Sequence, residues 1–110
     1  PDLKFLLALK HEAGGLLLRS RDGGKSFGDL GKGHGPAWVF DANTAVVAKV
    51  KTKDSPAGGV VRTADGGETW APVAPFTPAA LPRPGADGLY WLADGALHRT
   101  ADAGQTWAKV

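Results

Sequence analysis

The sequence predicts an all-β chain built from a repeated unit of short antiparallel strands. Three observations indicate this: one turn sequence recurs, the segments around it are short and rich in β-branched and aromatic residues, and turn-forming residues are abundant. The 110 residues include 16 glycines and 8 prolines, which suits many tight turns better than helices. We expect one domain with a modest core.

The turn sequence is found three times, always with Asp, Gly and a terminal aromatic residue in register. Its copies, called the repeated turns below, are RSRDGGKSF at 19–27, RTADGGETW at 62–70 and RTADAGQTW at 99–107. The spacings between their aspartates are 43 and 37 positions, and the difference lies mostly in one loop, KTKDSPAGG at 51–59. Stacked structural units tolerate an insertion of this kind. We therefore predict a partial unit at 1–31 and full units at 32–74 and 75–110.

Each unit contains strand-like segments bounded by Gly, Pro, Asp or Asn. The first unit has LKFLLALK at 3–10, GLLLRS at 15–20 and KSFGDL at 25–30. The second has AWVFD at 37–41, TAVVAKVK at 44–51, GVVRT at 59–63 and ETWAPV at 68–73. The third has TPAALPR at 77–83, GLYWLA at 88–93, GALHRT at 95–100 and QTWAKV at 105–110. Four strands in a unit of about 40 residues predict the blade of a β-propeller, so we expect two blades and three strands of another, eleven strands in all.

Every residue type in the repeated turn has a local structural role. Gly permits the positive φ that a tight hairpin needs, and Asp can accept hydrogen bonds from backbone N–H groups further round the loop. Flanking hydroxyls can satisfy other polar groups, and the aromatic ring, expected on the outgoing strand, can pack against the neighbouring sheet. The residues are Ser20, Asp22, Gly24 and Phe27, then Thr63, Asp65, Gly67 and Trp70, then Thr100, Asp102, Gly104 and Trp107.

This pattern, Ser/Thr-x-Asp-x-Gly-x-Ser/Thr-Trp/Phe, resembles the Asp box, or bacterial neuraminidase repeat (BNR). The repeat is known from β-propellers: sialidases, sortilin-type receptors, endo-xyloglucanases and photosystem assembly factors. The resemblance covers nearly the whole chain, and it implies that the turn links the third and fourth strands of a blade, on the face away from any active site. It implies a secreted or periplasmic protein. It does not imply one function, because these relatives do unrelated things.

Composition excludes several classes of partner and chemistry. The net charge is only +2 and the chain has no long Lys/Arg run, so nucleic acid is not expected. There are no cysteines, and one carboxylate per turn supplies too few oxygens for calcium, so we expect neither a metal nor a cofactor. No apolar run approaches about 18 residues, so membrane insertion is not expected either.

Candidate site residues are few. Arg19, Arg62 and Arg99 occupy the same place in each unit, which predicts a repeated packing or turn contact rather than a sialidase arginine triad. Trp38, Trp91 and Tyr90 are expected in the core, and the alternative for the two tryptophans is a sugar-stacking platform. His98 is expected to pack in its strand or at an edge, and Asp41 and Asp87 are expected to form turns. Loops on the face opposite the repeated turns form the predicted binding rim. The alternative is that these loop residues are only solvated and bind nothing. That rim comprises His11, Glu12, Lys32, His34, Lys53 and Asp54.

Two functions are compatible with the sequence. The first is a non-catalytic scaffold or interaction module that presents loops to a protein or a carbohydrate. The second is part of a sialidase-like or other glycoside hydrolase, with catalytic residues outside this chain. A glycosidase needs two carboxylates about 5–10 Å apart in one cleft, and no such pair can be assembled here, so no catalytic residue is assigned.

The exposed edges of an eleven-strand segment raise the question of assembly. Two chains would supply about six blades, a number within the range of closed propellers. The incomplete first unit of each chain would then be completed by strand exchange. The alternative is a piece of one longer propeller chain, which the absence of Met and the initial Pro1 favour.

Overall fold

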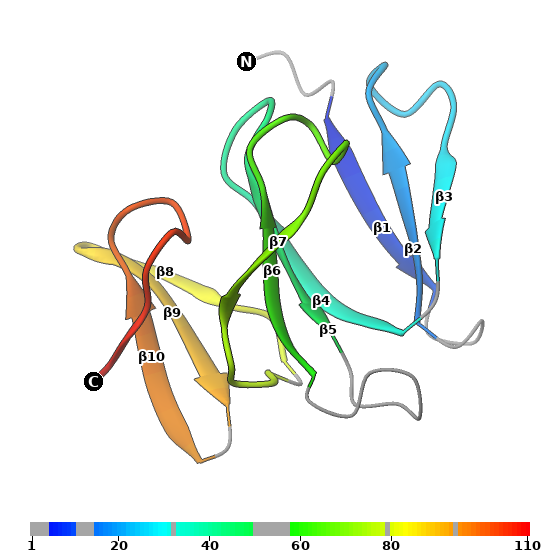
Figure 1. Cartoon of the computed structure of the whole chain (residues 1–110). Helices are drawn as coiled ribbons and strands as arrows, with labels where there is room; N and C mark the ends of the chain where they lie inside the picture. The colour runs from blue at the N-terminus through cyan, green and yellow to red at the C-terminus, as the bar shows by residue number, and fades with distance from the viewer. Residues whose placement is uncertain (1–4, 11–14, 32, 50–57, 79, 94) are drawn as a thin grey trace.

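Three antiparallel sheets lie side by side along the chain in the computed structural model, which describes residues 5–10, 15–31, 33–49, 58–78, 80–93 and 95–110 (Figure 1). The first contains β1 (Leu6–Lys10), β2 (Leu16–Ser20) and β3 (Gly28–Gly31). The second contains β4 (His34–Val39), β5 (Ala45–Lys49), β6 (Gly59–Thr63) and β7 (Ala71–Ala74). The third contains β8 (Arg83–Gly85), β9 (Gly88–Ala93), β10 (Ala96–Thr100) and β11 (Ala108–Lys109). The predicted all-β class is confirmed, with eleven strands in the described residues.

Strand pairing shows how the three sheets correspond. The hydroxyl residue that opens each repeated turn pairs with one residue of the preceding strand: Ser20 with Leu6, Thr63 with Ala45, and Thr100 with Leu89. Strand β1 is therefore equivalent to β5 and β9. Among the described residues, the first sheet has no counterpart of β4 and β8, and β1 lies at its edge.

Several strand boundaries differ from the sequence-based expectation. Strand β4 begins at His34, earlier than the predicted 37–41. Of the predicted 77–83 segment, only Arg83 lies in β8 (Arg83–Gly85). The fourth strands start directly after the turn aromatics, so Phe27, Trp70 and Trp107 precede these strands instead of lying on them.

The main core lies between the second and third sheets. It consists of Val46, Ala48, Val60, Phe76, Trp91 and Ala93, with Trp38, Phe40, Val73, Ala74 and Trp107 packed against it. The Phe76 ring centroid lies 6.4 Å from that of Trp91 and 5.5 Å from that of Trp107, both edge-on. The imidazole of His98 stacks on Phe76 at 3.9 Å. Phe76, which follows β7, is thus the centre of an aromatic cluster that joins two sheets.

The predicted core positions have different outcomes. Trp91 is fully buried, and its indole N–H donates to the Ala80 carbonyl at 2.6 Å. Trp38 is half-buried against the core. Tyr90 does not belong to the core, because it lies on the other face of β9 from Trp91, where its hydroxyl donates to the Asp87 carboxylate.

Replacing Trp91 tests the aromatic cluster. Trp91→Ala should reduce the free energy of unfolding by about 3–5 kcal/mol, because it removes the largest fully buried side chain and its hydrogen bond. Urea unfolding followed by circular dichroism measures the loss. Val110→Ala, which trims an exposed side chain, serves as the control and should change stability by less than about 0.5 kcal/mol. Equal effects of the two variants would contradict this assignment of the core.

Candidate functional site

The repeated turns share one hydrogen-bond pattern. In the second copy, Asp65 accepts from the hydroxyl of Thr63 at 2.8 Å, the backbone N–H of Thr69 at 2.9 Å and the Thr69 hydroxyl at 2.5 Å. The Gly67 N–H donates to the Thr63 hydroxyl at 2.9 Å. The other copies repeat each of these bonds with Ser20, Asp22, Gly24 and Ser26, and with Thr100, Asp102, Gly104 and Thr106. Each carboxylate therefore has both oxygens engaged within its own turn.

The carboxylates of the three turns are strongly acidic. The pKa values of Asp22, Asp65 and Asp102 are each lowered from 3.8 to about 2. The largest cause in every copy is the hydroxyl of the residue four positions on, followed by the backbone N–H of that same residue. Hydrogen bonding to the charged form, rather than a nearby cation, thus holds these groups ionised. A carboxylate in this state is suited to closing a loop and is a poor proton donor at neutral pH.

Arginines connect the first sheet to the repeated turn of the second, and the second sheet to that of the third. The Nε of Arg62 donates to the carbonyl of Ala103 at 2.9 Å, and Nη1 of Arg19 donates to the carbonyl of Gly66 at 3.4 Å. Both acceptors directly follow the aspartate of their turn. The expected repeated turn contact is therefore confirmed for these two arginines. Arg99, in the last of the three sheets, donates instead to the Asp87 carbonyl of its own sheet at 2.9 Å.

The aromatic residues of the turns are not equivalent in their surroundings. Trp70 and Trp107 each donate their indole N–H to a carbonyl of their own turn, Gly67 or Gly104, at 3.1 Å. Trp107 also packs on the aromatic cluster, which joins the second and third sheets. Phe27 has no such donor and is 47% exposed. Packing of the ring between sheets, expected for all three copies, is thus shown by Trp107 and not by Phe27.

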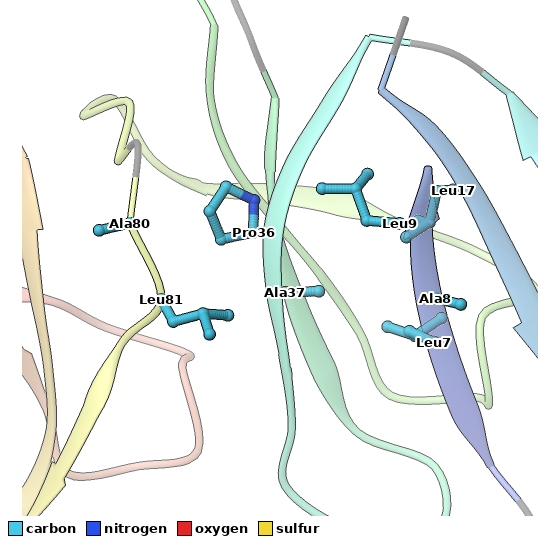
Figure 2. A pocket seen from close by; sticks show the side chains of 8 residues that line it. All are labelled: Leu7, Ala8, Leu9, Leu17, Pro36, Ala37, Ala80 and Leu81. Carbon is cyan, nitrogen blue, oxygen red and sulfur yellow. The ribbon is translucent and has the colours of Figure 1, made fainter. Parts of the chain in front are cut away.

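An apolar groove lies where the three units approach one another (Figure 2). Its volume is about 310 Å³ and its lining is Leu7, Ala8, Leu9, Leu17, Pro36, Ala37, Ala80 and Leu81. Figure 2 shows Leu7 and Leu9 extending from β1 toward β4, with Leu81 on the far side of that strand. Pro36 and Ala37 of β4 lie between these leucines. No lining residue carries a charge.

The groove follows the unpaired edge of the first sheet. Among the described residues, β1 pairs with β2 alone. At one end the sheets are tied together by the backbone N–H of His34, which donates to the Gly15 carbonyl at 3.0 Å. Within the described residues, no strand pairs with the other edge of β1. The sequence did not predict this groove, although the three strands of the first unit indicated an open sheet edge.

Only His34 of the predicted binding rim lies in the described part of the chain. It begins β4, where Nδ1 lies 2.9 Å from the Gly31 carbonyl and Nε2 lies 3.4 Å from Nζ of Lys49. Burial lowers the pKa of His34, and the positive charge of Lys49 lowers it further. His34 is therefore a half-buried neutral residue that bonds the end of the first sheet to the second. His11, Glu12, Lys32, Lys53 and Asp54 lie outside the described residues.

The other charged candidates also have local partners. Asp41 accepts from the backbone N–H groups of Asn43 and Thr44 at 2.9 Å each, as expected of a turn former.

Within the described ranges, no group of three or more His, Cys, Asp or Glu residues lies close enough together to hold a metal ion. The same residues include no helix long and apolar enough to cross a membrane.

Comparison with known proteins defines the fold. No protein-family model matches the chain, and no curated protein is similar to it. A solved structure described as YCF48 bound to D1 peptide is similar, with a TM-score of 0.54 and 20% sequence identity. The match covers 96% of this chain and 34% of that one. YCF48 is a photosystem assembly factor with a β-propeller fold, and the three sheets are accordingly blades of a partial β-propeller.

Acid titration tests the role of the turn carboxylates. Because their pKa values are depressed, the stability that they contribute is fully present above pH 3.8 and is lost as the pH falls through about 2. The melting temperature should therefore fall steeply between pH 4 and about 2. Asp65→Asn, which keeps the shape but removes the charge, should lower the melting temperature at pH 7 and flatten this acid dependence.

The matched control for that experiment is Glu68→Gln, in the same turn. Glu68 pairs with Arg21 at 2.8 Å on an exposed surface and accepts no hydrogen bond within its turn among those described. Its replacement should change stability little. An Asp65→Asn variant as stable as Glu68→Gln at pH 7 would show that the carboxylate does not hold the turn.

Proposed function

We propose that the chain is a non-catalytic interaction module of β-propeller blades that binds an extended, apolar segment of another protein. The observation that carries the proposal is the uncharged groove beside the open edge of β1. Its volume of about 310 Å³ is near the lower limit of ordinary ligand pockets, roughly 300–1,000 Å³. The similar protein YCF48 was solved with a D1 peptide, which supports a peptide as the class of ligand.

Strand addition is the binding mode that the groove supports. A peptide that pairs with β1 would occupy, in the first sheet, the position that β4 and β8 occupy in the others. Backbone hydrogen bonds to the strand edge would supply affinity, and alternate side chains would enter the groove. Leu7 and Leu9 would contact those side chains, with Ala37 beneath them. Apolar alternating segments are therefore the expected ligands.

The lining of the groove favours a peptide over a carbohydrate. Sugar sites require polar groups to bind hydroxyls, whereas every residue of this groove is aliphatic or proline. A glycoside hydrolase would additionally need two carboxylates facing one cleft. The turn aspartates instead bond within their own loops. These contacts support the interaction module over the sialidase-like alternative.

The repeated turns support a place within the Asp-box group of propellers. All three copies have the same aspartate-centred bonding, although no family model matches the chain. We infer that the turns are folding elements and that the ligand site lies elsewhere on the blades. A secreted or periplasmic location follows from this resemblance and is part of the proposal.

Peptide binding tests the proposed function. The probes are fluorescein-labelled peptides of roughly six residues, the usual length of a strand, in which leucine or valine alternates with threonine. Fluorescence anisotropy should show binding, and hydrogen exchange should slow at the amides of β1. Ala37→Arg, which places a long cation in the groove, should weaken binding at least about tenfold, or ~1.4 kcal/mol.

Two controls make the outcome specific. Leu92→Arg changes an exposed leucine outside the groove and should leave peptide affinity unchanged. Peptides that bind the wild type and Ala37→Arg equally, or that leave exchange at β1 unaltered, would contradict the proposed site. Hydrolysis of sialyl or β-glucan reporter substrates by the purified chain would contradict a non-catalytic function.

A further inference from the structure

The second and third sheets present equivalent residues on one face, called the forward face below. The pairing of Thr63 with Ala45 and of Thr100 with Leu89 sets the register between the sheets. Because side chains alternate along a strand, four positions then share the forward face in each sheet. They are Val46, Ala48, Val60 and Arg62 in the second sheet, and Tyr90, Leu92, Leu97 and Arg99 in the third.

The forward face is covered in one sheet and open in the other. Val46, Ala48 and Val60 are 0% exposed, because the third sheet packs on them. Their counterparts in the third sheet include Leu92, which is 59% exposed, and Leu97, which is 38% exposed. A cavity of about 570 Å³ lies on this open face, lined by Ala80, Leu81, Arg83, Pro84, Tyr90, Leu92 and Leu97.

The arginines show the same difference between covered and open faces. Arg62 reaches the turn of the next sheet, and so does Arg19. Arg99 instead bonds to Asp87, with its Nε 3.8 Å from the carboxylate, and its side chain is 39% exposed. Arg99 is the counterpart of Arg62. In a following sheet, its partner would therefore be a turn carbonyl.

The opposite, reverse face of the first sheet is the matching surface. In the third sheet the reverse face is buried: Leu89 is 4% exposed and Trp91 is 0% exposed. Their counterparts in the first sheet, Leu6 and Ala8, are half-exposed. The first repeated turn also presents the Gly23 carbonyl, equivalent to those of Gly66 and Ala103, and among the described residues no arginine donates to it.

We propose that the forward face of the third sheet docks onto the reverse face of the first sheet in a second copy of this chain, with Arg99 donating to the Gly23 carbonyl. The contact repeats an interface that the chain already makes twice within itself. It is a head-to-tail contact, and such contacts close into rings when the rotation permits. Two copies would contribute six sheets, within the range of roughly four to eight blades in closed propellers.

The charges at one position of the repeated turn predict that the dimer is weak and that a substitution there can raise its affinity. Between the first two sheets, Glu68 lies 3.5 Å from Arg19 and 2.8 Å from Arg21. Between the second and third, Gln105 occupies the position of Glu68, so the arginine contact does not require an acid. Lys25 occupies it in the first sheet and would bring a like charge toward Arg99. Lys25→Glu should therefore tighten the contact.

The experiment is light scattering coupled to size exclusion over a range of protein concentrations. We expect the wild type to shift with concentration from the 11.4 kDa of one chain to twice that mass. Arg99→Ala and Leu92→Arg should remain monomeric at concentrations where the wild type is dimeric. Lys25→Glu should lower the dissociation constant roughly three- to tenfold. Circular dichroism confirms that each variant is folded, which the exposed positions of these residues favour.

A matched groove variant separates this inference from the proposed peptide function. Ala37→Arg should lose peptide binding but dimerise as the wild type does, because Ala37 lies in the groove and not on the open forward face. A chain that stays monomeric at every concentration would overturn the inference. So would a dimer that Arg99→Ala and Leu92→Arg leave intact, or growth into oligomers of steadily rising mass. A monomer that binds only an added blade protein would identify another occupant and also overturn it.

Discussion

A carboxylate that closes a hairpin also fixes the direction of one backbone carbonyl, and the stacking of the sheets depends on that carbonyl. Asp65 draws the hydroxyl and the N–H of Thr69 toward itself, and Asp102 does the same with Thr106. The two residues that follow Asp102 take positive φ, with Ala103 at 58° and Gly104 at 85°. The carbonyl of Ala103 is thereby presented to Arg62 of the preceding sheet. The repeated turn thus specifies an interface as well as a loop.

The glycine two residues after each turn aspartate serves the same interface. A Cβ on Gly104 would approach Cγ1 of Val46 to 2.6 Å, and one on Gly67 would approach Cδ of Arg19 to 2.8 Å. Both contacts are with the preceding sheet, so a side chain here would separate the sheets in addition to straining the positive φ. Asp, Gly and Arg are therefore linked: the first shapes the turn, the second lets it approach, and the third bonds it. Such coupling explains why all three recur together in every unit.

Local chemistry made much of the fold predictable from the sequence. Strands β6 and β9 have the predicted limits, 59–63 and 88–93, because each is a run of strand-forming residues between turns. The predicted fourth strands begin too early: all three turn aromatics precede their strands, and the indoles of Trp70 and Trp107 bond back to their own turns. The groove could not be predicted, since Leu7, Pro36 and Leu81 come from three units and meet only after the sheets stack.

The alternation of side chains gives β1 two different surfaces, and this places peptide binding and self-association on one strand. Leu7 and Leu9 point toward β4 and line the groove, whereas Leu6 falls on the reverse face that the second copy would cover. A second copy packed on that face would restrain β1 without occupying its edge. The two proposed contacts therefore use different sides of one strand, which is why Ala37→Arg and Leu92→Arg can separate them.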